Sequence, residues 1–151
     1  MKVYFASPWF NKEQAEREER VKAKLRQLGF EVWSPKENCV CPPNATKEQR
    51  QKVFSDNVKG IKSSNVIFAI TDGKDMGTIW EAGFACGYNS NVSEKDKIKV
   101  VYYCETLGPN GEFNLMLAQS GNIIFTNFED LDKLPELIKE GENLEYVGNI
   151  E

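Results

Sequence analysis

Two carboxylates lie six residues apart in the segment Asp75-Met-Gly-Thr-Ile-Trp-Glu81-Ala-Gly83. The apolar run before it, Val66-Ile-Phe-Ala-Ile70, predicts a buried strand, and the small residues after Glu81 predict a helix. Both carboxylates therefore fall where a strand becomes a helix, and we expect the helix dipole to favour the ionised form of Glu81. An ionised carboxylate in a partly apolar crevice suits attack on a carbon with oxocarbenium character.

A structural alternative exists for the same stretch. Thr78 and Glu81 also match a helix capping box, which needs no function. Gly77 would let a ligand approach the backbone, and Tyr4, Trp9 and Phe10 offer flat faces for a base or a sugar, although such aromatic residues usually belong to a core. Only their convergence on one crevice favours the functional interpretation.

The sequence contains no histidine, which excludes Ser-His-Asp and Cys-His catalysis and histidine-ligated metals. The four cysteines are expected to be reduced and non-catalytic, because Cys39-Val-Cys41 lacks the spacing of a zinc site and Cys86 and Cys104 fall in apolar patterns. Neither GxGxxG after the first strand nor a P-loop motif is present. We therefore expect no metal and no cofactor.

Composition adds weak constraints on partners. Hydrophobic residues make up 40% and charged residues 28%, as is usual for a globular protein. The net charge of −4 and the lack of long apolar runs argue against a nucleic acid polymer or a membrane as partner. A cytoplasmic location is expected by default.

Strand and helix patterns alternate along a single expected domain of residues 1–151. Strands are expected at residues 2–6, 30–33, 65–71, 99–103 and 122–125, and helices at 11–28, 46–63, 78–89, 113–119 and 131–139. Residues 34–45 are expected to form a long loop that covers a site. This alternation predicts an α/β fold: a flavodoxin-like, doubly wound five-stranded parallel sheet of order 2-1-3-4-5 with helices on both faces. The ligand crevice of such a sheet opens after its first and third strands, where Trp9 and Asp75 lie.

Four short segments together resemble nucleoside 2-deoxyribosyltransferases. They are Val3-Tyr-Phe-Ala-Ser-Pro-Trp-Phe-Asn11, Ser34-Pro-Lys-Glu-Asn38, Asp75-Met-Gly-Thr-Ile-Trp-Glu-Ala-Gly83 and Phe113-Asn-Leu-Met116, in the order of that family. The resemblance runs from about residue 2 to residue 126.

The resemblance implies transfer of 2-deoxyribose between nucleobases with retained configuration, from a deoxynucleoside donor to a free nucleobase acceptor. Glu81 matches the family nucleophile, which forms a deoxyribosyl ester, Asp75 matches a carboxylate beside the base, and Tyr4 matches a tyrosine near the nucleophile. Substrate contacts are expected from Ala6, Trp9, Phe10, Asp56, Asn57, Gly77, Asn114, Met116 and Glu151. Asn114 and Met116 match residues lent by a neighbouring subunit, so the resemblance implies a homo-oligomer, usually a hexamer built from dimers. The C-terminal tail, residues 141–151, is expected to reach an active site.

One position departs from the family pattern. The segment Phe54-Ser-Asp-Asn-Val-Lys-Gly-Ile61 carries Asn57 where the family has an aspartate that contacts the base. An amide donates as well as accepts hydrogen bonds, whereas a carboxylate only accepts, so base preference stays open. Two other functions also stay open: hydrolysis of a 2′-deoxynucleoside 5′-monophosphate by a related N-glycosidase, and nucleotide binding without catalysis.

Overall fold

A computed structural model describes residues 1–108 and 110–151. Its centre is a parallel five-stranded sheet of order β2-β1-β3-β4-β6. The strands are β1 (Lys2–Ala6), β2 (Glu31–Trp33), β3 (Val66–Ile70), β4 (Lys99–Tyr103) and β6 (Ile123–Phe125). This is the predicted flavodoxin-like order, with β6 as the fifth strand, so the predicted fold is confirmed.

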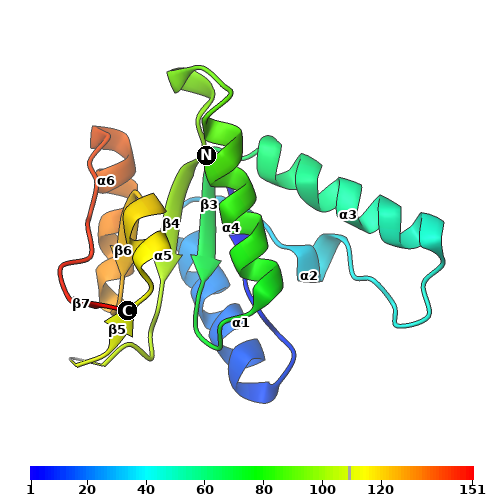
Figure 1. Cartoon of the computed structure of the whole chain (residues 1–151), viewed down its shortest axis with the longest axis horizontal. Helices are drawn as coiled ribbons and strands as arrows, with labels where there is room; N and C mark the ends of the chain where they lie inside the picture. The colour runs from blue at the N-terminus through cyan, green and yellow to red at the C-terminus, as the bar shows by residue number, and fades with distance from the viewer. Residues whose placement is uncertain (109) are drawn as a thin grey trace.

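Helices cover both faces of the sheet because the strand residues alternate between two cores. On one face, Val3 and Phe5 pack with buried residues of α1 (Lys12–Gln27), η2 (Glu129–Lys133) and α6 (Leu134–Glu140). On the other, Tyr4 and Ala6 pack with α3 (Lys47–Lys62), α4 (Met76–Asn89) and α5 (Leu115–Ser120). Figure 1 shows α4 lying along the sheet while α3 projects beyond it.

Polar side chains begin α1 and α3 where the sequence predicts. Thr46 and Gln49 form the expected capping box at α3. Asn11 caps α1 by accepting from the Gln14 amide, but the Gln14 side chain accepts from the Phe10 amide at 3.0 Å instead of closing a box on Asn11. This extra bond holds the loop after β1 against the first turn of α1.

The structure differs from the expected elements in four places. The expected loop at residues 34–45 contains a short helix, α2 (Pro35–Asn38), which Pro35 can start because its missing amide proton is not needed in a first turn. Helix α4 begins at Met76 rather than Thr78. Two strands of two residues each, β5 (Glu112–Phe113) and β7 (Asn149–Ile150), pair in parallel and fasten the C-terminal tail. A short 3-10 helix, η1 (Glu94–Asp96), lies between α4 and β4.

A buried group of charges joins α1 to α2. The Glu18 side chain is 0% exposed, and its two oxygens accept from Lys22 at 3.0 Å and from Lys36 at 2.8 Å. Glu37 of α2 in turn pairs with Lys22 at 3.0 Å and with Arg26 at 2.6 Å. These bonds hold α2, and with it the start of the following loop, at a fixed place beside the sheet.

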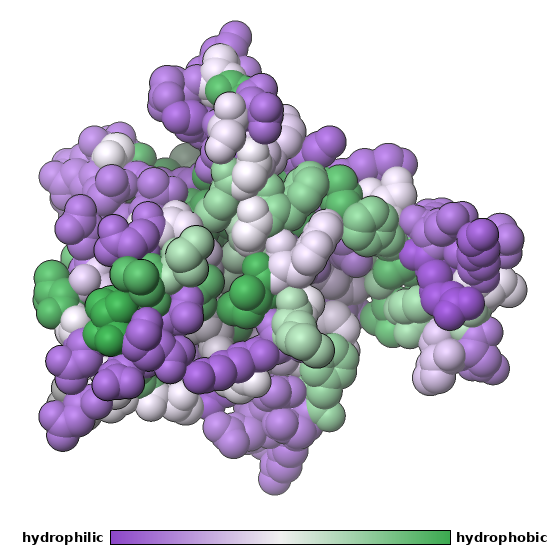
Figure 2. All heavy atoms as spheres, viewed as in Figure 1, coloured by the Kyte–Doolittle hydropathy of each residue, from purple (hydrophilic) through white to green (hydrophobic). Residues whose placement is uncertain are grey.

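The surface is mixed. Figure 2 shows apolar side chains gathered over α4 and α5 and a strongly hydrophilic end of α3. Four rings, here called the aromatic strip, follow one another across α3 and α4: Phe54, Trp80, Phe84 and Tyr88, with centroids 5.5–6.4 Å apart. Among the described helices, none has the length and hydrophobicity needed to cross a bilayer.

Candidate active site

A cavity of about 300 Å³ opens at the carboxyl ends of β1 and β3, where the winding of the sheet reverses. Four segments line it: the loop after β1, the region from α2 to the following loop, the α3 helix and the start of α4. The lining residues are Ser7, Trp9, Phe10, Pro35, Cys39, Val40, Cys41, Val53, Asn57, Asp75, Gly77, Thr78 and Glu81. Of the residues predicted from the sequence, Glu81, Asp75, Trp9, Phe10, Gly77 and Asn57 thus come together.

Glu81 lies against the sheet, held by a tyrosine from β1. Tyr4 is fully buried between β2 and β3, and its hydroxyl donates to Glu81 Oε1 at 2.5 Å. Its ring stacks on Trp33, with centroids 5.0 Å apart. Among the described residues nothing donates a hydrogen bond to Glu81 Oε2, so this oxygen is left for a ligand.

The environment raises the pKa of Glu81 from 4.5 to about 7. Burial is the largest cause, the negative charge of Asp75 adds to it, and the Tyr4 hydrogen bond opposes both. The expected stabilisation of the ionised form by the helix dipole was therefore outweighed. Glu81 lies in the second turn of α4, beyond the reach of most of that effect.

Asp75 is the N-cap of α4. A tight turn with positive φ at Gly73 (81°) and Lys74 (52°) carries the chain from β3 to Asp75, whose Oδ2 accepts from the Thr78 amide at 2.8 Å and the Thr78 hydroxyl at 2.9 Å. A side chain at Gly77 would begin 3.2 Å from this oxygen. The Thr78–Glu81 capping box considered in the sequence is therefore replaced by an Asp75 cap, which leaves the Glu81 side chain free to meet Tyr4.

The aromatic wall of the cavity comes from the loop after β1. Trp9 and Phe10 lie with their rings 5.3 Å apart, and Phe10 is 72% exposed, so a flat ligand could stack there. Ala6, also expected to contact substrate, is fully buried and pairs with Ala69 of β3 below the loop. It supports the wall without being part of the lining.

Asn57 enters the cavity from α3, whereas its neighbour Asp56 does not. The Asn57 Oδ1 atom lies 3.2 Å from the Tyr4 hydroxyl and accepts from the Cys39 thiol at 2.9 Å. Asp56 is turned away on the helix and pairs with Lys52 and Lys59. Of the two adjacent candidates, the structure brings only Asn57 to Glu81.

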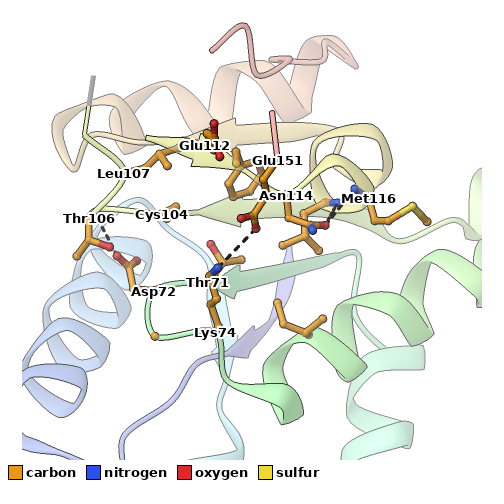
Figure 3. Close-up of a pocket in the computed structure, with 14 residues that line it drawn as sticks. Thr71, Asp72, Lys74, Cys104, Thr106, Leu107, Glu112, Asn114, Met116 and Glu151 are labelled. Carbon is orange, nitrogen blue, oxygen red and sulfur yellow. Dashed lines mark hydrogen bonds and ion pairs between the residues drawn. The ribbon is translucent and has the colours of Figure 1, made fainter. Parts of the chain in front are cut away.

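Asn114, Met116 and Glu151 line a second cavity, of about 390 Å³, between the ends of β3 and β4 and the C-terminal tail. Figure 3 shows them there with Asp72, Lys74 and Thr106. Asn114 caps α5 through its Oδ1 atom and Met116 is 73% exposed. The tail reaches this cavity through the Glu151 carboxylate, 3.5 Å from Lys74, and not the cavity of Glu81 in the same chain.

A known protein family matches most of this chain. The family model for nucleoside 2-deoxyribosyltransferase matches residues 3–129. The chain belongs to this family. Membership of the nucleoside 2-deoxyribosyltransferase family implies nucleoside substrates and indicates an enzyme of deoxyribosyl transfer or hydrolysis.

Solved structures resemble this chain over most of its length. The 2-deoxyribosyltransferase of Bacillus psychrosaccharolyticus is 28% identical, with a TM-score of 0.79, and the match covers 97% of this chain and 100% of that one. Two more distant structures share the fold. The Leishmania mexicana 2-desoxiribosyltransferase is 18% identical (TM-score 0.60; 91% and 97% covered). The Clostridium botulinum CMP N-glycosidase BcmB is 16% identical (TM-score 0.51; 92% and 99% covered). No curated protein sequence matches the chain significantly.

Cys39 is a lining residue that the sequence did not indicate, and among those residues it is the one that bonds to a predicted site residue. It was expected to be a bystander, yet its thiol contacts Asn57 and burial raises its pKa to about 11. The sequence feature that could have indicated Cys39 is its place in residues 34–45, the segment expected to cover the site. The spacing of Cys39 and Cys41 bears only on metal binding and does not predict this contact.

Proposed function

We propose that this protein transfers 2-deoxyribose from a deoxynucleoside to a free nucleobase by a retaining double displacement at Glu81. The observation that carries the proposal is the Tyr4–Glu81 hydrogen bond inside a cavity that also holds Asp75 and an aromatic wall. It fixes one carboxylate oxygen and presents the other, as a positioned nucleophile requires. A non-catalytic nucleotide-binding module would have no use for such a buried carboxylate.

In the first half-reaction, Glu81 Oε2 attacks C1′ of the deoxynucleoside. The bond from C1′ to the base nitrogen breaks, its electron pair leaves with the base, and the base takes up a proton delivered from solvent beside Asp75. The product is a deoxyribosyl ester of Glu81. Tyr4 helps because its hydrogen bond favours the ionised form of Glu81.

In the second half-reaction, a nitrogen of the incoming base attacks the same carbon from the vacated face. The ester bond breaks, Glu81 recovers its carboxylate, and the incoming base loses a proton. Two inversions at C1′ give net retention. Water in place of the second base would give free deoxyribose, or deoxyribose 5-phosphate from a 5′-monophosphate, which is the hydrolase alternative.

The cavity favours nucleosides over their 5′-monophosphates. Among its described lining residues there is neither lysine nor arginine, and a phosphate would need such a partner to offset its charge near Asp75 and Glu81. This supports the transferase over the monophosphate N-glycosidase.

We also propose a homo-oligomer, a hexamer built from dimers, in which Asn114 and Met116 serve the site of a neighbouring subunit. Two features support an assembly: both residues are exposed and line a cavity other than that of Glu81, and the aromatic strip leaves Trp80 48% exposed. Capping engages Asn114 Oδ1 and leaves its amide hydrogens for a ligand.

The proposal is tested by base exchange. Incubation with 2′-deoxyinosine and free adenine should yield 2′-deoxyadenosine of unchanged anomeric configuration, measured by chromatography and NMR. Glu81→Ala should abolish it, because the covalent ester can no longer form. Glu136→Ala, on the far face of the sheet, is the matched control and should retain full activity.

Release of free deoxyribose, or of deoxyribose 5-phosphate from a 5′-monophosphate, without exchange would identify the hydrolase instead. If neither product forms with any deoxynucleoside or its 5′-monophosphate, the enzymatic proposal fails.

A further inference from the structure

A thiol bridges two segments of the cavity wall. Cys39 ends α2, with its amide bonded to Pro35 O, and its Sγ atom donates to Asn57 Oδ1 of α3 at 2.9 Å. The burial that raises the pKa of Cys39 to about 11 keeps the thiol protonated at neutral pH, so it can act as a donor. The bond therefore couples the position of α2 to the orientation of the Asn57 amide.

The thiol fixes that orientation. Asn57 Oδ1 accepts from the Cys39 thiol and lies 3.2 Å from the Tyr4 hydroxyl, whose single proton goes to Glu81. The oxygen and nitrogen of an amide diverge from the same carbon, so engaging the oxygen turns the nitrogen elsewhere. Asn57 lines the cavity, and among the described residues none accepts a hydrogen bond from its Nδ2 atom. Its two protons are available to a bound molecule.

We propose that Asn57 Nδ2 reads a hydrogen-bond acceptor on the edge of the nucleobase, and that Cys39 is the positioning residue that holds the amide in this orientation. The inference rests on the proposed function and gives it a substrate class. Bases with a carbonyl oxygen at the recognised edge should be preferred over those with an amino group there, because two donors facing each other cannot bond.

The test compares matched substrates. For the wild-type protein, kcat/KM should be about tenfold higher for 2′-deoxyuridine than for 2′-deoxycytidine, and for 2′-deoxyinosine than for 2′-deoxyadenosine, as expected for one hydrogen bond. Asn57→Asp, which only accepts, should reverse the preference. Cys39→Ala should bring the ratio close to one because the amide can then rotate, and Cys39→Ser should restore it.

Cys41→Ala is the matched control. Cys41 lines the same cavity, but the described contact of its thiol is to Pro42 O at 3.8 Å, so its loss should leave the ratio unchanged. Thermal melts of all variants show whether a changed ratio accompanies an intact fold. A wild-type preference for amino bases, or a ratio that moves equally in Cys39→Ala and Cys41→Ala, would overturn the inference.

Failure of the inference can be separated from failure of the proposed function. Binding of free uracil, cytosine, hypoxanthine and adenine to Glu81→Ala, measured by calorimetry, requires no turnover. Tighter binding of the oxo bases, lost in Glu81→Ala/Cys39→Ala, supports base reading even without exchange. Equal binding of oxo and amino bases refutes it even if exchange is observed.

Discussion

Burial and the nearby charge of Asp75 place the pKa of Glu81 at about 7, so its ionised fraction changes across the neutral range. In the proposed mechanism the carboxylate is the attacking form, which is present above this pKa and lost as the pH falls through it. We expect kcat/KM to fall about tenfold per pH unit below pH 7 and to level off above pH 8. A pH profile from 5 to 9 at constant ionic strength measures this. A rate that stays level down to pH 5 would contradict the assignment.

Asp75 combines two roles that substitution can separate. Asn caps a helix as well as Asp does, so Asp75→Asn should keep the melting temperature, whereas Asp75→Ala should cost about 1 kcal/mol. Because the Asp75 charge raises the pKa of Glu81, Asp75→Asn should also shift the acidic limb of the kcat/KM profile to lower pH. Thermal unfolding and pH profiles of both variants provide the measurements. Equal destabilisation by Asn and Ala would speak against the cap.

At the scale of helices and strands, much of the fold could be predicted from the sequence. Strand β3 is an apolar run throughout, β1 and β4 are apolar after their first residue, and Thr46 and Asn11 carry local cap signals. These elements therefore need little tertiary information. The start of α4 could not be placed, because Asp75 and Thr78 are both good caps and only packing selects one. The pair β5–β7 has too few residues to leave a pattern.

The site was predictable where topology alone brings residues together. Tyr4 and Glu81 are 77 residues apart, but the sheet order places the end of β1 beside the end of β3. The Cys39–Asn57 contact depends on the path of α2 and its loop, which no periodicity records. That path in turn depends on the buried pairs of Glu18, which the apolar pattern of α1 does not show.

Those pairs predict a large effect from a substitution remote from the cavity. Lys22→Met removes a cation from beside the fully buried Glu18 and should destabilise the protein by about 2–4 kcal/mol, because a buried charge loses half of its compensation. Urea unfolding measures the change. Lys12→Met, whose partner Glu16 is exposed, is the control and should change stability little. Equal effects of the two would show that the buried network adds nothing.

At the scale of the whole molecule, the proposed sharing of Asn114 between subunits predicts complementation. The Glu81→Ala and Asn114→Ser variants should each lose activity. Serine at position 114 keeps a capping side chain at the start of α5. Unfolding and refolding the two together should restore roughly a quarter of wild-type activity, because half of randomly paired dimers then hold one complete site. If the mixed chains sediment as oligomers but recover no activity, Asn114 acts in the site of its own chain and the proposed sharing is wrong.

The fluorescence of Trp80 can report on subunit assembly. Trp80 is 48% exposed and lies between Phe54 and Phe84, so its emission reports how polar the surroundings of the aromatic strip are. Subunits that cover the strip would shift this emission to the blue, and dilution would reverse the shift. Trp9 lines the cavity of Glu81 instead, so its emission would respond to a ligand bound there. With Trp9→Phe and Trp80→Phe variants, the protein's own fluorescence can follow assembly and ligand binding as separate signals, without an attached dye.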